Sequence, residues 1–145
     1  MNWSFRKQHI VKTTVGAIIQ KKQDEKRLKI LLTRRGYPPF RGKWCLPGGH
    51  IEPNETAQHA IIREVEEEVG LNFDAQFFGY FDEIIPEQKI HAVVLIYTGM
   101  ATGQLQAQPV EVTELKWFAL EDALALSLAF HHNQILEAYK EKTSL

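Results

Sequence analysis

The sequence predicts a single α+β domain in which helices cover a mixed β-sheet. Segments rich in β-branched and aromatic residues occur on both sides of one amphipathic helical segment. Two further helical segments end the chain, so strands and helices do not alternate regularly as they do in a doubly wound sheet. The length of 145 residues suits one domain, residues 1–145, with a hydrophobic core of its own.

The composition excludes several classes of protein. A formal net charge of −1 offers no electrostatic attraction to nucleic acid or to an anionic membrane. Cys45 is the single cysteine, which excludes an internal disulfide and a zinc site built from several cysteines. No apolar run approaches the roughly 20 residues of a membrane span, and the first residues lack an apolar stretch of signal-peptide length. We therefore expect a soluble, cytoplasmic protein with neither nucleic acid nor a membrane as its partner.

The first elements are two strands and a loop. Residues 11–20 and 28–34 are β-branched and apolar, and the charged segment 21–26 between them is expected to form the turn. Residues 34–42 (RRGYPPFRG) contain two glycines and two prolines, which predicts a loop. The segment 43–49 (KWCLPGG) is then a short extended piece that ends in a Gly-Gly turn.

The central helix is expected over residues 55–69, where apolar side chains recur at helical spacing. Asn54 is the expected N-cap, and Gly70 stands where a helix often ends in a left-handed residue. The remaining strands are expected at 72–83, 90–100 and 115–120, with a polar connector at 102–114. The two closing helices are expected at Glu121–Leu126 and Phe130–Lys142.

One face of the predicted helix carries a cluster of carboxylates. At about 100° per residue, Glu68 lies about 40° to one side of Glu64 and Glu67 about 60° to the other. The adjacent arc is apolar and would face the core: Ile61, Val65 and Val69. Arg63 can offset part of the repulsion, but one arginine does not balance three carboxylates, whereas a hard cation such as Mg²⁺ prefers oxygen ligands. The alternative is a solvated glutamate-rich face.

These glutamates belong to a longer pattern, G-x5-E-x7-R-E-U-x-E-E-x-G-U, in which U is apolar. Every fixed position is filled: Gly49, Glu55, Arg63, Glu64, Val65, Glu67, Glu68, Gly70 and Leu71. The pattern resembles the signature of the Nudix hydrolase family, which includes MutT-like and ADP-ribose pyrophosphatase-like members. The order of the flanking strands and the terminal helices also resembles that family. The resemblance implies a Nudix-type α/β/α sandwich with a mixed β-sheet.

The resemblance also implies an active site for metal-dependent hydrolysis. Mg²⁺, with Mn²⁺ as the other candidate, would be bound by residues of the motif: the backbone carbonyl of Gly48, Glu64, Glu67 and Glu68. Arg63 would orient a glutamate, and Glu55 would lie in the outer shell of the site. Glu111 matches a frequent additional metal or base position, and the alternative for it is a solvated loop residue. Glu83 and Glu87 are further loop candidates, and the choice of general base stays open.

The loop before the motif supplies candidates for substrate binding. Arginines can bind phosphate with two hydrogen bonds and aromatic rings can stack on a base, which selects Arg34, Arg35, Tyr37, Phe40 and Arg41. Alternatively, the two aromatic residues only pack the Pro-rich loop. The segment LAFHHNQIL is similar to an LAFDH-x-x-IL segment of ADP-ribose pyrophosphatase-like members and related transcription regulators, with His131 in place of Asp. His131 and His132 are expected to start a helix, not to bind metal.

Three functions follow from the resemblance. The first is hydrolysis of the pyrophosphate bond in a nucleoside diphosphate linked to another moiety, with ADP-ribose or a related nucleotide sugar as substrate. The second is hydrolysis of (d)NTPs to monophosphate and pyrophosphate, which sanitises the nucleotide pool. The third is a non-catalytic nucleotide-sensing module, which would have no need of a complete glutamate set. The expected partner is thus a small nucleotide derivative, and a homodimer is the assembly common in the family.

Overall fold

The computed structural model describes residues 10–24, 27–108 and 111–143. Its strands are β1 (Lys12–Asp24), β2 (Arg27–Arg35), β3 (Trp44–Cys45), β4 (Gly48–His50), β5 (Asn72–Phe73), β6 (Gln76–Ile85), β7 (Ile90–Gly99), β8 (Ala101–Thr102) and β9 (Val112–Ala119). Its helices are α1 (Ala57–Val69), α2 (Leu120–Ala125) and α3 (His132–Thr143), with a 3₁₀ turn η1 (Pro86–Gln88) between β6 and β7. Within these described ranges, no helix is long and apolar enough to cross a membrane.

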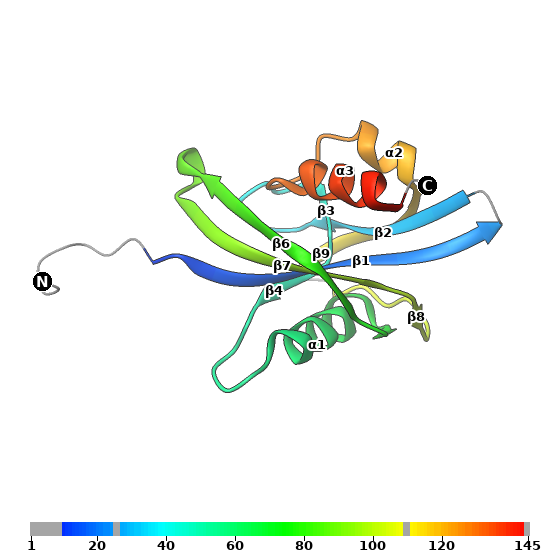
Figure 1. The fold of residues 1–145 in the computed structure, drawn as a ribbon, viewed down its shortest axis with the longest axis horizontal. Helices are drawn as coiled ribbons and strands as arrows, with labels where there is room; N and C mark the ends of the chain where they lie inside the picture. Colours follow the sequence, from blue (N-terminus) through cyan, green and yellow to red (C-terminus); the bar gives the residue numbers. More distant parts are fainter. Residues whose placement is uncertain (1–9, 25–26, 109–110, 144–145) are drawn as a thin grey trace, which may run out of the picture.

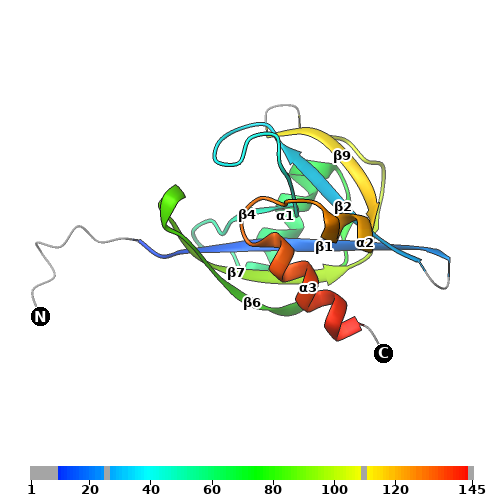
Figure 2. The same cartoon turned by 90° about the horizontal axis from the view of Figure 1, so that it is seen from above.

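The main sheet separates α1 from the other two helices (Figures 1 and 2). Its strand order is β3-β2-β1-β7-β6, with β4 also paired to β1 and β9 to β2. β1 and β7 run parallel, whereas the other neighbours in this sheet are antiparallel. A small second sheet pairs β5 with β8. The predicted α+β fold, a mixed sheet between layers of helix, is therefore confirmed.

The apolar residues of neighbouring strand positions pack on opposite faces of the sheet, as the two-residue period of a strand requires. Three fully buried positions face α2 and α3: Ile18, Ile30 and Leu32. Three others face α1: Ala17, Ile19 and Leu31. On α1 itself, Ile61, Val65 and Val69 are buried in this second cluster, as the helical spacing predicted. The helix is thereby held with a fixed face toward the sheet, which decides where its carboxylates lie.

α1 begins two residues later than predicted, and its N-cap is Thr56, not Asn54. The Thr56 hydroxyl accepts a hydrogen bond of 3.1 Å from the His59 backbone N–H, which is otherwise without an intrahelical partner. Asn54 has a φ of 65° in the turn before the helix, a conformation that asparagine tolerates better than most residues. Gly70 ends the helix with a φ of 74°, as predicted.

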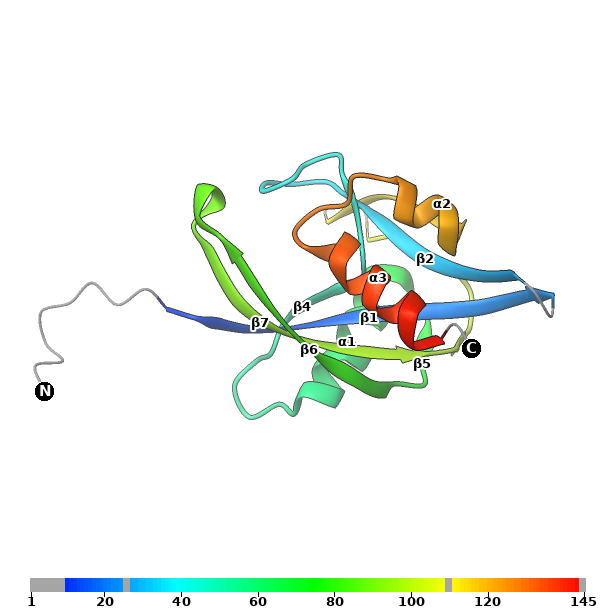
Figure 3. The same cartoon turned by 45° about the horizontal axis from the view of Figure 1, so that its top comes forward.

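Several strand boundaries also differ from the prediction; β9, for example, begins at Val112 and not at residue 115, because it pairs with β2. β1 continues to Asp24, which pairs with Arg27, because pairing with β2 extends the hairpin through charged residues; the expected turn positions 25–26 lie outside the described residues. The predicted strand 72–83 is divided, since residues 72–73 pair with β8 and β6 starts at Gln76. The β6–β7 hairpin then curves toward the side of the sheet that carries α2 and α3 (Figures 1 and 3).

Candidate active site

A cavity of about 300 Å³ opens beside the Gly-Gly segment of β4. Strands β1, β2, β4, β6 and β7 line it, together with α1 and the segment that leads into α3. Its volume lies at the lower end of the range for small-molecule sites. Arg35, Glu68, Glu83 and His132 all reach this one cavity although they are far apart in the sequence.

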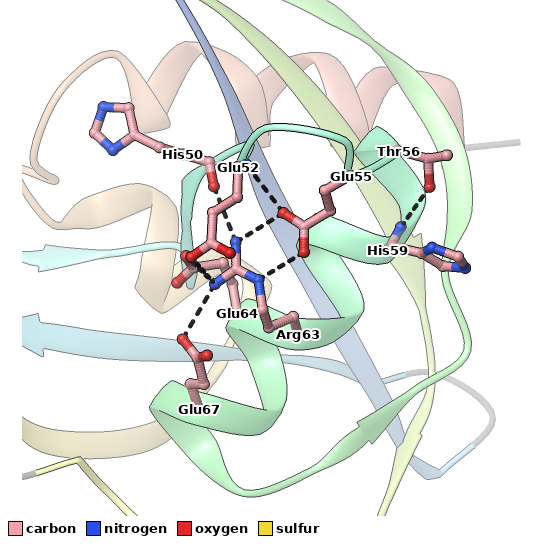
Figure 4. A network of polar contacts seen from close by, with 8 residues as sticks. All are labelled: His50, Glu52, Glu55, Thr56, His59, Arg63, Glu64 and Glu67. Atoms are coloured by element: carbon pink, nitrogen blue, oxygen red, sulfur yellow. Dashed lines mark hydrogen bonds and ion pairs between the residues drawn. The ribbon is translucent and has the colours of Figure 1, made fainter.

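Arg63 organises the carboxylates of α1 (Figure 4). Its Nε and Nη2 donate hydrogen bonds of 2.7 and 2.9 Å to the two carboxylate oxygens of Glu55. Its Nη1 donates to Glu64 at 3.0 Å and to Glu67 at 3.2 Å, and its Nη2 also donates to the His50 carbonyl at 3.1 Å. The hydrogen bonds from Arg63 hold the pKa of Glu55 at about 2. The guanidinium thus connects α1 to β4 and to the loop before the helix.

The two glycines of β4 are required by close contacts on opposite sides. A Cβ atom on Gly48 would overlap the Val15 carbonyl oxygen of β1, with which β4 pairs. A Cβ atom on Gly49 would overlap the carboxylate of Glu64. The Gly-Gly sequence therefore lets the Glu64 carboxylate lie directly against the β4 backbone.

Glu68, which is buried, and Glu64, which is partly buried, form a pair of neighbouring carboxylates. Glu68 is 7% exposed, and burial raises its pKa well above the usual value. The nearby carboxylates of Glu64 and Glu111 raise it further, and a hydrogen bond with the Gly48 backbone opposes them. Burial also raises the pKa of Glu64, against the hydrogen bond from Arg63. Both shifts arise first from burial, and in Glu68 the neighbouring carboxylates add repulsion that a bound cation would relieve.

The chemistry of this pair fits a divalent cation. Among the described residues, no three His, Cys, Asp or Glu side chains are grouped so that they could hold a metal ion by themselves. Mg²⁺ needs fewer protein ligands, because it is usually bound by one or two carboxylates and keeps waters that bridge to substrate phosphates. Glu64 and Glu68 beside Gly48 supply such a set. Neither Glu64 nor Glu67 belongs to the cavity lining: the Glu64 carboxylate lies against Gly49, and the Glu67 side chain is 56% exposed and bound by Arg63. The roles of both as metal ligands stay predictions.

Two of the predicted substrate-binding residues line the cavity, Arg35 and Tyr37. Arg35 is held in place by a 2.7 Å hydrogen bond from its Nε to the Pro39 carbonyl. Its guanidinium carbon lies 4.5 Å from the centre of the Tyr37 ring and 4.8 Å from that of Phe130. A fixed guanidinium in the wall of the cavity is suited to bind a phosphate group.

The other three predicted substrate-binding residues, Arg34, Phe40 and Arg41, lie outside the lining. Successive side chains of a strand point to opposite faces, so Arg35 points into the cavity and Arg34 points away from it. Arg34 forms an ion pair with Glu114 at 3.5 Å. Phe40 packs edge-on against Phe130, with ring centres 5.1 Å apart, and Arg41 is exposed. Phe40 thus packs the loop and stabilises the ring that Arg35 contacts.

Among the loop candidates, Glu111 lines the cavity and Glu87 does not. The charge of Glu111 acts on both Glu68 and Tyr37, which places it at the same end of the cavity as Glu68. Cys45 lies in the wall, and burial raises the pKa of its thiol to about 11. This side chain therefore stays protonated and packs as a small apolar group.

Two further residues have a larger part in the cavity than the sequence indicated. Glu83 is 5% exposed, and its carboxylate accepts a 3.5 Å hydrogen bond from the His131 backbone N–H. Burial raises the pKa of Glu83, although the positive charge of Arg35 opposes the shift. Burial lowers the pKa of His132 to about 3, and its Nδ1 accepts a 3.0 Å hydrogen bond from the Leu46 N–H. A carboxylate at an inward position of a strand is the sequence signal that could have singled out Glu83.

Comparison with known proteins agrees with this arrangement. Residues 11–139 match the model of the NUDIX domain family. The chain is 32% identical over 117 residues to an ADP-ribose pyrophosphatase of Methanocaldococcus jannaschii, covering 79% of this chain and 68% of that protein. It is 33% identical over 90 residues to a Bacillus subtilis protein named as a proposed 8-oxo-dGTP diphosphatase, covering 61% of this chain and 56% of that one.

A solved structure extends the likeness to the whole fold. The NUDIX domain of Shewanella oneidensis NrtR, solved with ADP ribose, superposes with a TM-score of 0.81 at 28% identity, covering 93% of this chain and 90% of that one. The family match therefore includes the glutamate helix, the Gly-Gly segment and the strands that carry Arg35 and Glu83. On this evidence, the chain belongs to the Nudix hydrolase family.

Proposed function

We propose that the protein is a Mg²⁺-dependent hydrolase of the pyrophosphate bond in a nucleoside diphosphate linked to another moiety, with ADP-ribose as its leading substrate. The observation that carries this proposal is the pair of neighbouring carboxylates Glu64 and Glu68 against the Gly-Gly segment of β4, of which Glu68 lines the cavity. ADP-ribose is supported by the name of the Methanocaldococcus relative and by the ligand of the Shewanella NUDIX domain.

The residues of the cavity divide the work of hydrolysis. When bound, Mg²⁺ or Mn²⁺ supplies charge neutralisation at the phosphate oxygens and a water of lowered pKa. Glu64 and Glu68 would hold the ion, and Arg63 keeps Glu64 in position by a 3.0 Å hydrogen bond. Glu111 is a carboxylate at the same end that can accept the proton of the attacking water. Arg35, whose strand β2 pairs with β9 next to Glu111, would bind a phosphate oxygen and orient the bond to be cleaved.

A second candidate is the hydrolysis of (d)NTPs to monophosphate and pyrophosphate. It is favoured by the name of the Bacillus relative, which specifies 8-oxo-dGTP. Both candidates require the same water attack on a phosphoanhydride, so the metal end of the cavity serves either. The two candidate substrates differ in their sugar and base, which would contact the part of the cavity beyond Arg35, so that part decides between the two candidate functions.

The test is turnover of ADP-ribose, NADH, nucleotide sugars, dNTPs and 8-oxo-dGTP, with Mg²⁺ and with EDTA, followed by ion-exchange chromatography. We expect AMP and ribose 5-phosphate from ADP-ribose, and no products in EDTA. A monophosphate and pyrophosphate from one triphosphate, with ADP-ribose intact, would assign the second candidate instead. Tight binding without turnover of any compound would contradict both and indicate a sensing module.

A further inference from the structure

Glu83 lies in the cavity but away from the carboxylates of α1. It pairs with Ala92 of β7, which pairs in turn with Lys12 of β1, so the three side chains share one face of the sheet. β4, which carries Gly48, lies on the other side of β1. Three strand spacings of about 4.8 Å separate β6 from β4, which is roughly 14 Å. Glu83 is therefore too far from the Glu64–Glu68 pair to share a metal ion with it.

The carboxylate of Glu83 has little of its hydrogen-bonding capacity used. An ionised carboxylate can accept about four hydrogen bonds, and Glu83 accepts one, at 3.5 Å, from the His131 N–H. Among the described residues, none forms an ion pair with it, although the positive charge of Arg35 acts on it. At 5% exposure, the side chain is also largely removed from solvent. Its free lone pairs face the cavity, where a ligand with hydrogen-bond donors would satisfy them.

The surroundings of Glu83 favour a sugar over a base. Besides histidines, the aromatic residues in the described lining are Tyr37 and Phe130, and the Arg35 guanidinium lies over both rings. The Phe130 ring also contacts the His132 ring, with ring centres 5.3 Å apart. His132 is neutral and its Nδ1 accepts from Leu46, so its proton is on Nε2, a donor. The Glu83 carboxylate as an acceptor and the His132 Nε2–H as a donor are together suited to bind hydroxyl groups.

We propose that Glu83 determines specificity for the sugar of the substrate by accepting hydrogen bonds from the vicinal hydroxyls of a ribose ring. The inference rests on the proposed function, because it assumes that the phosphates lie between Glu68 and Arg35. A ribose attached to those phosphates extends beyond Arg35, where Glu83 lies. The diol belongs either to the nucleoside or to the terminal ribose of ADP-ribose. A deoxy sugar would leave a buried carboxylate oxygen without a partner, which costs more affinity than one hydrogen bond contributes.

Binding by isothermal titration calorimetry tests this without requiring turnover. The ligands are ADP-ribose, its analogue lacking the nucleoside 2′-hydroxyl, and its analogue lacking the 2-hydroxyl of the terminal ribose, each with Ca²⁺ in place of Mg²⁺. We expect the unmodified protein to bind ADP-ribose on the order of 10²-fold more tightly than one of the analogues. The analogue that loses affinity identifies which ribose contacts Glu83.

Two variants assign this preference to the carboxylate. Glu83→Gln keeps the size of the side chain, and we expect it to reduce the preference to a few-fold. Glu83→Asp keeps the charge but shortens the side chain by one methylene group, which draws the carboxylate back from the cavity. We expect this variant to reduce the preference as well. Asp82→Asn is the matched control, because Asp82 is the preceding residue on β6 and is exposed; its preference should equal that of the unmodified protein.

Equal binding of all three ligands by the unmodified protein would overturn the inference without any variant. It would also be overturned if the preference persisted in Glu83→Gln, or if Asp82→Asn removed it equally. Hydrolysis with Mg²⁺ separates the two proposals. Turnover without a Glu83-dependent preference contradicts the inference alone, whereas such a preference without turnover contradicts the proposed function alone. Absence of binding by any ligand contradicts both.

Discussion

At the α1 end of the cavity, the buried Glu68 lies beside Glu64, and Glu111 adds a third negative charge. At the α3 end, Glu83 is alone, receives a hydrogen bond from a backbone N–H and lies within the field of Arg35. Both ends bury ionisable groups, but only the first gathers like charges that a bound cation would balance. The difference is what we expect if, as proposed above, the first end carries out the chemistry and the second end selects and positions the ligand.

The neighbouring histidine supports this division. His132 is buried as a neutral ring that joins the start of α3 to Leu46, between β3 and β4. His132 therefore holds the α3 end together through a hydrogen bond that the fold itself supplies, whereas Glu83 keeps acceptor capacity for a ligand. Changes at the first end should lower turnover and leave the fold intact, whereas changes at the second end should alter affinity and stability.

The largest effect is expected from Glu68→Gln. Loss of this negative charge should lower kcat on the order of 10³-fold, because the site can no longer hold its cation or stabilise developing charge. In EDTA, the variant should resist urea at least as well as the unmodified protein, because the buried member of a pair of neighbouring carboxylates is gone. Glu66→Gln is the control, since Glu66 is exposed on the same helix. Unchanged turnover in Glu68→Gln, or an equal loss of turnover in Glu66→Gln, would contradict the proposal that the α1 end of the cavity carries out the chemistry.

An intermediate effect is expected from a pair of adjacent arginines. Arg35→Ala should raise KM roughly tenfold or more, because a hydrogen bond between charged groups in the cavity is lost. Arg34→Ala should change KM less than about threefold, since Arg34 pairs with Glu114 outside the cavity. Steady-state kinetics on the substrate found in the panel measures both. Equal effects of the two substitutions would show that the phosphates do not lie against Arg35.

The smallest effect is expected on the pH dependence of stability. Burial lowers the pKa of His132 in the folded state to about 3, from its ordinary value of 6.5. The unfolded state therefore binds more protons between these values, and this residue's contribution to stability is lost as pH falls from 6.5 toward 3. The slope amounts to at most about 1.4 kcal/mol per pH unit. His132→Gln should flatten the curve of unfolding free energy between pH 7 and pH 5, by at most this slope, measured by urea titration.

His59→Gln serves as the control for that measurement. His59 is exposed on α1, on the other side of the sheet from α3, so its replacement removes a histidine but leaves the buried ring of His132 in place. An identical slope in all three proteins would mean that His132 is not the buried neutral base at the α3 end.

The glutamate helix illustrates what could be predicted from the sequence. Spacings of three and four residues place Glu64, Glu67 and Glu68 near one another in any α-helix. The apolar residues beside them predicted the buried face correctly, and Arg63 does contact Glu64 and Glu67. The N-cap was missed because Asn54 and Thr56 both suit that position, and the turn geometry before the helix selects between them.

The substrate side illustrates what could not be predicted. The sequence placed five residues of the 34–42 loop near the ligand, and the fold brings Arg35 and Tyr37 into the cavity but leaves Arg34, Phe40 and Arg41 outside. Which of two adjacent arginines enters is decided by the register of β2 against β3 and β9. A shift of one residue would exchange them. No local pattern contains that register.

The sequence by itself determined the family, the mixed sheet with its helices, and the face of α1 that carries the carboxylates, because each depends on spacings along a short stretch of chain. Only the tertiary structure decided that Glu68 is buried beside Glu64, that Glu83 lies about three strands from them, and that His132 is neutral. Burial and electrostatic fields arise from groups brought together by strand pairing across long separations in the chain. For that reason, the charge of the site can be anticipated from one helix, whereas its selectivity depends on the whole sheet.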